Sequence, residues 1–410
     1  MPSVHVTSEV GRLQAVLVHE PGEELQAVTP DTRQDYLYDD IIDIEFARDE
    51  HRCMTDVLRR FTEVYEVRRL LTEVVEREEA RDFLIGRTMD VVPSAPLARR
   101  MAALPGDELV TALVEGTPGE GGPLVQKLND VVYALPPVPN LFFTRDIGIV
   151  IGDHGVIGSM RHGSRWSEEL LIKALFRFHP LLETAGILYD GSEERQHTFT
   201  LEGGDVHPLR HDLVLLGHSS RSSAAAIDRL CDLLFEHTPV TDILMVVMPG
   251  EPVAIHLDMV FTQIDRDVCV VFPPHFVGPR RLGVLHRRKG RAGIREMPDF
   301  FSALEQVDMA MEPVFCGGGH RAVQEREQWG SGCNLVALRP GVALAYRRNE
   351  VTLGELERGG FRVVTAADLL ADRESIGDGE RAVITLSGAE LVRGGGGPRC
   401  MTLPLRREDP

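Results

Sequence analysis

The 410-residue sequence has little positive charge and no long hydrophobic run. Lys and Arg together number 44, against 63 Asp and Glu, so the formal net charge is −19. Such a surface repels polyanions, which argues against nucleic acid and anionic membrane as partners and favours a small cationic substrate. No stretch reaches the roughly 18 apolar residues that a membrane-spanning helix needs. The N-terminal segment MPSVHVTSEVGRLQAVLVHEPG lacks a basic start and a long apolar core, so we expect no signal peptide.

Cysteine is also scarce, and none of the six cysteines belongs to a C-x-x-C pair. A soluble chain of this length does not need disulfides, so we expect reduced thiols and a cytoplasmic protein. A zinc site built on paired cysteines is not expected. The 39 glycines and 25 prolines are spread along the chain, which excludes a collagen-like or low-complexity protein. The hydrophobic content of 43% predicts a large buried core.

A small strand-rich unit recurs along the chain. Each copy combines a short β-branched strand, a tight turn and a second strand. The five copies occupy residues 13–19, 146–160, 205–223, 256–274 and 334–349. Helical patterns separate them, for example at residues 167–178 and 222–236. Five such units predict an α/β repeat closed on itself rather than a parallel sheet.

Residues 68–125 break this rhythm with an almost purely helical pattern. Apolar residues form one stripe at residues 70–75 and another at residues 109–114. We therefore predict a helical insertion between the first and second units. Amphipathic stripes mostly serve packing, so we expect no chemistry from this segment.

The C-terminal segment RGGGGPRCMTLPL, residues 393–405, has the sharpest chemical pattern. Consecutive glycines let the backbone approach a ligand closely. Cys400 follows them, and the neighbouring Arg399 is expected to lower the pKa of the thiol and favour a nucleophilic thiolate. A flexible tail and a small buried hydrophobic cysteine are the alternatives. A phosphate-binding loop is disfavoured, because the strand, glycine pattern and helix that it requires are missing.

The segment IHLDMVF contains His256 and Asp258. If it is a strand, these two side chains share one face, and Leu257 and Met259 lie on the other. A histidine beside a carboxylate can act as a base or as a metal ligand. No H-x-H or H-E-x-x-H pattern supplies further ligands, so we predict no metal.

Two more segments place carboxylates beside strand starts and turns. TLEGGDVHP contains Glu202 and Asp205, and PNLFFTRDIG contains Asn140, Arg145 and Asp146. Acidic residues at such positions are often solvated turn residues. However, one cysteine, one histidine and several carboxylates at the edges of repeat units could converge on the axis of a closed ring.

The combination of PNLFFTRD, LEGGDV, HLDMVF, WGSGCN and GGPRCM, with LYDDI at residues 37–41, resembles the arginine deiminase family of guanidine-modifying enzymes. The motifs occur in the family's order over nearly the whole chain. The resemblance implies a five-bladed pseudosymmetric α/β propeller with a helical insertion, so that residues 1–410 form one catalytic domain. It also implies hydrolysis of L-arginine to L-citrulline and ammonia without a cofactor or metal. We further expect a homo-oligomer.

The resemblance also implies a role for each candidate residue. Two carboxylates suit a planar guanidinium because they accept its N–H groups in pairs. A thiolate then attacks the central carbon, and a histidine protonates the departing ammonia and activates water. The implied residues are Cys400 as nucleophile, His256 as general acid and base, Glu202 as its orienting partner, Asp146 and Asp258 as guanidinium ligands, and Asn140, Arg165 and Arg221 as ligands of the amino-acid end.

One position departs from the family pattern. The family usually has arginine five residues before the nucleophile, where this sequence has Gly395. The departure leaves the choice of substrate open. The alternatives are an amidinotransferase, a hydrolase of another guanidino compound, and a catalytically idle relative with a binding role.

Overall fold

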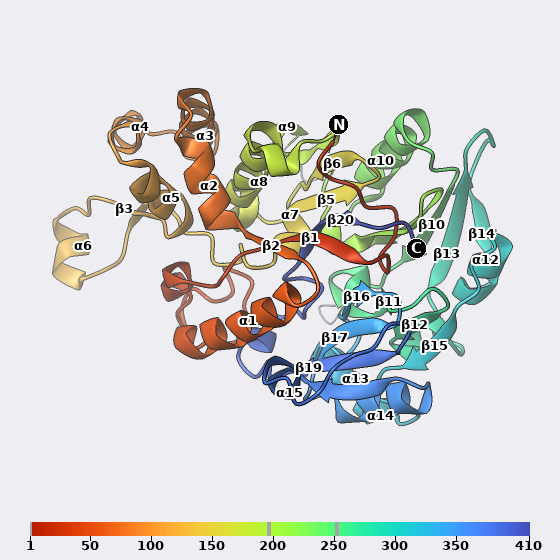
Figure 1. Ribbon diagram of the computed structural model, residues 1–410. Coiled ribbons are helices and arrows are strands. Elements are labelled where there is room, and N and C mark those ends of the chain that lie inside the picture. Colours follow the sequence, from red (N-terminus) through yellow and green to blue (C-terminus); the bar gives the residue numbers. More distant parts are fainter. Residues whose placement is uncertain (1, 195–197, 251–253) are drawn as a thin grey trace.

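The computed structural model describes residues 2–194, 198–250 and 254–410. Five of its sheets share a three-strand pattern in which a middle strand pairs antiparallel with one neighbour and parallel with the other (Figure 1). Listed with the middle strand second, these are β20 (Leu403–Arg407), β1 (Leu13–Val18) and β2 (Glu63–Glu66); β5 (Gly148–Ile151), β6 (His154–Ile157) and β7 (Ile187–Asp190); β8 (Val206–Arg210), β9 (Leu213–His218) and β10 (Asp242–Val247); β11 (Phe261–Gln263), β12 (Val268–Val271) and β15 (Glu312–Phe315); and β16 (Val336–Arg339), β17 (Val342–Tyr346) and β19 (Ala382–Leu386). Two sheets are wider, because β13 (Gly283–Arg288) and β14 (Arg295–Met297) extend the third, and β18 (Arg362–Thr365) extends the fifth.

A helix lies between the middle strand and its parallel neighbour in each sheet, because parallel strands cannot be joined by a tight turn. The connecting helices are α1 (Ile44–Arg59), α8 (Trp166–Phe178), α10 (Ala224–His237), α12 (Phe300–Gln306) and α14 (Glu350–Arg358). The shorter helices are α7 (Thr144–Ile147), α9 (Gly191–Glu194), α11 (Pro273–Phe276), α13 (Arg321–Trp329) and α15 (Ala366–Leu370). Among the described residues, no helix combines the length and the apolar character that crossing a membrane requires.

The first sheet joins the two ends of the chain. β1 pairs antiparallel with β20, so Leu17 lies opposite Leu403. The N-terminal strand therefore lies beside the strand that immediately follows Cys400 and holds this C-terminal segment against the body of the protein (Figure 1).

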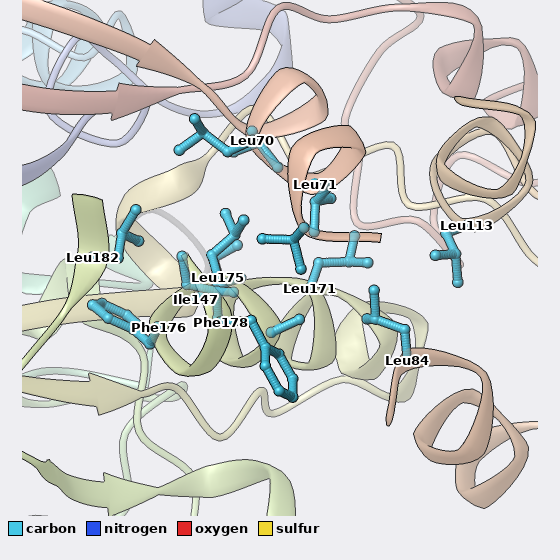
Figure 2. Close-up of a cluster of buried hydrophobic side chains, with 14 of the residues drawn as sticks. Leu70, Leu71, Leu84, Leu113, Ile147, Leu171, Leu175, Phe176, Phe178 and Leu182 are labelled. Atoms are coloured by element: carbon cyan, nitrogen blue, oxygen red, sulfur yellow. The ribbon is translucent and has the colours of Figure 1, made fainter. Parts of the chain in front are cut away.

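Helices dominate residues 67–128. They are α2 (Val67–Val75), α3 (Glu78–Val91), α4 (Ala95–Ala102), α5 (Gly106–Val114) and α6 (Pro123–Leu128), and one short pairing joins β3 (Thr117–Pro118) to β4 (Tyr133–Leu135). Leu71 of α2 and Leu84 of α3 face Leu171 of α8 in a shared apolar cluster (Figure 2). This cluster fixes the helical segment, orange and tan in Figure 1, against the second sheet.

The strand predicted for IHLDMVF is wrong at its first half. His256 has an extended backbone, but Leu257–Met259 form a turn of 3₁₀-helix, and β11 begins only at Phe261. The buried carboxylate of Asp205 accepts the backbone N–H of Leu257 at 2.8 Å, which removes that N–H from any strand ladder. As a result Met259 does not lie opposite His256, and both residues line the same cavity.

Candidate active site

Loops from all parts of the chain meet at a buried cavity of about 30 Å³. Six of the eight predicted site residues line it: Asn140, Asp146, Arg165, Arg221, His256 and Cys400. The other two, Glu202 and Asp258, are fully buried behind it and contact His256 and Cys400 respectively. The structure therefore brings together residues that are up to 260 positions apart in the sequence.

Cys400 is buried, with 4% of its surface exposed. Its thiol can donate to Asp258 Oδ2 at 3.5 Å, and the side-chain amide of Asn334 donates to its Sγ at 3.1 Å. Asn334 Oδ1 in turn accepts the backbone N–H of Cys400, so one side chain fixes both ends of the cysteine. Burial and the negative charges of Asp258 and Asp146 raise the pKa of the thiol well above its ordinary value. In the free protein the thiol is therefore protonated.

The expectation that Arg399 activates the thiol is wrong. The Arg399 guanidinium is fully buried and paired with two carboxylates, Glu9 at 3.0 and 3.2 Å and Asp258 Oδ2 at 2.9 Å. Its charge is thus neutralised before it can stabilise a thiolate. Arg399 instead fixes the orientation of Asp258.

Asp146 and Asp258 have the same arrangement of partners. Arg165 donates to Asp146 Oδ2 at 2.7 Å, and Arg399 donates to Asp258 Oδ2 at 2.9 Å. The second oxygen of each carboxylate, Oδ1, is buried without a hydrogen-bond partner among the described residues. Buried carboxylate oxygens without donors are costly, so these two atoms mark a place for a ligand with N–H groups.

His256 is the link between Asp146 and Glu202. Its Nε2 lies 2.8 Å from Glu202 Oε2, and its Nδ1 lies 3.8 Å from Asp146 Oδ1. Burial disfavours the charged ring, but the charge of Asp146 and the hydrogen bond to Glu202 outweigh it and raise the pKa of His256 to about 9. Burial likewise opposes ionisation of Glu202, yet Arg221 and His256 lower its pKa. At neutral pH the ring is an imidazolium.

Asp146, Glu202 and His256 also place metal-ligand atoms within 4.8 Å of one another. Arg165 already pairs with Asp146, and Arg221 donates to Glu202 Oε2 at 3.2 Å, so these carboxylates have cationic partners from the chain itself. The chain's own charges explain the cluster, and the expected absence of a metal stays a prediction.

The three residues predicted to hold an amino-acid end differ in their contacts. Arg165 is occupied, because it also donates to Glu168 from Nε and Nη2, the latter at 2.8 Å, and to the Asn140 carbonyl. The Asn140 side chain donates to the carbonyl of Tyr36 at 2.8 Å. By contrast, the Arg221 guanidinium has one hydrogen bond within the described part of the chain, to Glu202.

The glycine run forms one wall of the cavity. A Cβ at Gly396 would lie 2.5 Å from the ring of Phe143, and one at Gly397 would lie 2.8 Å from Asn334, so side chains there would displace the wall. Gly395 differs. It has a left-handed φ of 84°, and nothing lies within 4 Å of the position of a Cβ. Its place in the cavity wall leaves open space.

A larger cavity of about 830 Å³ adjoins the inner one. Both are lined by Leu37, Arg221, Ile255, Met259 and the Gly394–Gly395 pair. Across its rim Arg393 pairs with Asp40 at 2.9 Å, which links the glycine loop to the segment around residue 40. The inner cavity therefore opens outward past Arg221 and Gly395.

Sequence reasoning missed the supporting residues Glu9, Glu168 and Asn334. Glu9 and Glu168 lie in no motif that indicates burial, and Glu9 pairs with an arginine 390 positions away. Asn334 ends the WGSGCN motif, but the sequence does not show that its side chain reaches Cys400.

Comparisons with known proteins agree with this arrangement. Residues 124–407 match the family model described as arginine deiminase. Proteins named arginine deiminase from Bacillus cereus (strain ATCC 10987 / NRS 248) and Listeria welshimeri are each 32% identical to the chain, and each alignment covers 99% of both sequences. Among solved structures, an amidinotransferase from Microseira wollei aligns with a TM-score of 0.55 at 12% identity, covering 99% of this chain and 98% of that one. The N-terminal domain of the arginine dihydrolase ArgZ aligns with a TM-score of 0.51 at 15% identity, covering 95% and 97%. These structural likenesses indicate a common α/β fold.

Proposed function

This chain belongs to the arginine deiminase family, whose activity is hydrolysis of a C–N bond in a linear amidine, and we propose that it converts L-arginine to L-citrulline and ammonia through a covalent intermediate on Cys400. One observation carries the proposal. Asp146 Oδ1 and Asp258 Oδ1 are buried without donors on either side of a cysteine thiol. A guanidinium is planar, positively charged and rich in N–H donors, so it satisfies both atoms and presents its central carbon to Sγ.

The substrate itself activates the thiol in this proposal. Without a ligand, burial and two nearby carboxylates keep Cys400 protonated. A bound guanidinium neutralises these carboxylates and adds a positive charge beside Sγ, which favours the thiolate. The thiol proton then leaves to solvent. Asn334 holds the sulfur in place through its donated hydrogen bond at 3.1 Å.

His256 handles the remaining protons. The thiolate forms a bond to the guanidinium carbon, and the C–N bond to ammonia breaks as the imidazolium gives its proton to the leaving nitrogen. Nδ1 is the nitrogen available for this step, because Nε2 is bound to Glu202. The neutral ring then takes a proton from water, whose oxygen attacks the same carbon. The carbon–sulfur bond breaks, and citrulline leaves.

We propose a five-bladed pseudosymmetric propeller for the five three-strand units, with residues 68–125 inserted into one catalytic domain spanning 1–410. The repeated strand order and the pairing of β1 with β20 support this architecture, because they give each unit the same plan and join the last strand to the first. A homo-oligomer and a cytoplasmic location stay predictions, and light scattering tests the first of them.

Mass spectrometry combined with product assays tests the function. The protein is mixed with L-arginine and quenched, and ammonia and citrulline are measured in parallel. We expect citrulline, ammonia and an adduct on the peptide that contains Cys400. Cys400→Ser should abolish all three, and Cys53→Ser, which changes a cysteine outside the cavity, should abolish none. Ornithine formed only when an amine acceptor is added would identify an amidinotransferase instead.

A further inference from the structure

The proposed reaction leaves two arginines at the outer cavity without a role. Arg347 and Arg348 follow β17 directly, are exposed, and line the cavity of about 830 Å³. Neither guanidinium has a carboxylate partner among the described residues, whereas Arg393 on the same rim pairs with Asp40. Two adjacent unpaired cations are notable in a chain whose net charge is −19.

Their backbone position is fixed relative to the catalytic loop. The Tyr346 hydroxyl donates to the carbonyl of Gly396 at 3.2 Å, and the Arg347 N–H donates to the carbonyl of Leu386 at 2.8 Å. The two arginines are therefore held beside the loop that carries the glycine run and Cys400. They stand on the outward side of the passage that leads past Gly395.

The amino-acid end of a substrate needs a cation there. With the guanidinium at Cys400, the carboxylate of an amino acid points outward past Arg221. Arg165 is occupied by Asp146 and Glu168, Gly395 has no side chain, and Arg221 is shared with Glu202. The unpaired positive charge on this path is that of Arg347 and Arg348.

We propose that Arg347 and Arg348 form a carboxylate subsite that binds the amino-acid end of the guanidino substrate. The inference rests on the proposed function, since it takes the guanidinium end to lie at Cys400. Asp39 and Glu350 line the same cavity and supply negative charge for the α-ammonium group. The subsite thus selects a zwitterionic amino-acid end over a decarboxylated or neutral one.

The test compares L-arginine with L-argininamide, which keeps the α-amino group and lacks the negative charge. In the double variant Arg347→Ala/Arg348→Ala, kcat/KM for arginine should fall about 10- to 100-fold, mainly through KM, as expected for loss of a charge-assisted contact. The value for argininamide should change less than about 2-fold. The double variant Arg347→Lys/Arg348→Lys should retain most of the preference for arginine, because it keeps the charge.

A matched control removes two charges elsewhere. Arg229 and Arg280 are exposed and lie outside both cavities, so Arg229→Ala/Arg280→Ala should leave both substrates unchanged. An unaltered ratio of arginine to argininamide in the Arg347/Arg348 double variant, in a protein that still makes citrulline, overturns the subsite alone. Failure of the native protein to bind or convert arginine overturns both the function and the subsite.

Discussion

Replacement of Glu202 by glutamine tests how the protein keeps His256 protonated. Glu202→Gln preserves the shape of the side chain and removes its charge, while His256 and Glu202 are 2.8 Å apart and both buried. A hydrogen bond to a charged group contributes about 1.5–3 kcal/mol, and one pKa unit corresponds to about 1.4 kcal/mol. The pKa of His256, about 9 in the native protein, should therefore fall by about 1–2 units.

The change should appear in the pH dependence of activity. Protonated His256 donates to the leaving ammonia, so the descending alkaline limb of kcat/KM should move to lower pH by about 1–2 units in the variant. Titration of the His256 ring by NMR, in a Cys400→Ser background, measures the same shift directly. Glu327→Gln is the matched control, because Glu327 is a buried glutamate that bonds to Thr352 and lies outside the cavity.

Linkage gives a second readout with a defined sign. The pKa of His256 is raised on folding, so the imidazolium adds stability that is fully present below about pH 6.5 and is lost as the pH rises through about 9. The difference in free energy of unfolding between the native protein and Glu202→Gln should shrink over that window. An alkaline limb and a ring pKa that both stay at native values would refute the role given to Glu202.

Four further predictions concern the supporting residues and the proton balance. Asn334→Leu should slow alkylation of Cys400 by iodoacetamide about 10-fold at fixed pH with an unchanged circular dichroism spectrum, because the donor to sulfur is lost; equal rates would contradict this. Glu9→Gln should lower the free energy of unfolding in urea by about 3–5 kcal/mol, since it leaves buried arginines unpaired, and because the pKa of Glu9 is lowered, this difference should be present above about pH 4.5 and vanish in acid; a loss below about 1 kcal/mol would count against the ion pairs. Gly396→Ala should abolish turnover by pushing an aromatic ring into the cavity, whereas Gly395→Ala, with open space, should cost only about 1 kcal/mol of stability for its left-handed φ; similar activities of the two variants would oppose this. Binding of arginine to the native protein near pH 7.5 should release about one proton, as titration calorimetry in buffers of different ionisation enthalpy would measure, and zero release would exclude activation of the thiol by the substrate.

The sequence predicted the residues that line the cavity better than the residues that support them. Cys400 and His256 stand in motifs whose glycines and neighbouring polar residues indicate a site. Glu9 gives no such signal, because its partner Arg399 lies at the other end of the chain and only the pairing of β1 with β20 brings them together. Ion pairs between distant segments have no local pattern, so composition and periodicity do not reveal them.

Local periodicity failed at a specific place for a specific reason. The alternation of apolar and polar residues around Leu257 is that of a strand, yet the Asp205 carboxylate captures the N–H of Leu257 and turns the chain. The same long-range effect reversed the role of Arg399. A cation next to a cysteine in sequence lowers the pKa of its thiol only if the guanidinium points to the sulfur, and here two carboxylates draw it away.

The charges around the thiol explain why substrate and nucleophile depend on each other. A continuous set of ion pairs surrounds Cys400, with as many carboxylates as cations at neutral pH. The carboxylates are Glu9, Asp146, Glu168, Glu202 and Asp258, and the cations are Arg145, Arg165, Arg221, Arg399 and the His256 imidazolium. This set is balanced only while the thiol is protonated, and an unpaired buried charge costs several kcal/mol. A thiolate without substrate, or a guanidinium beside an intact thiol, would each leave one charge uncompensated. Binding of the cation and loss of the thiol proton therefore favour each other, so the nucleophile forms where its target is already in place.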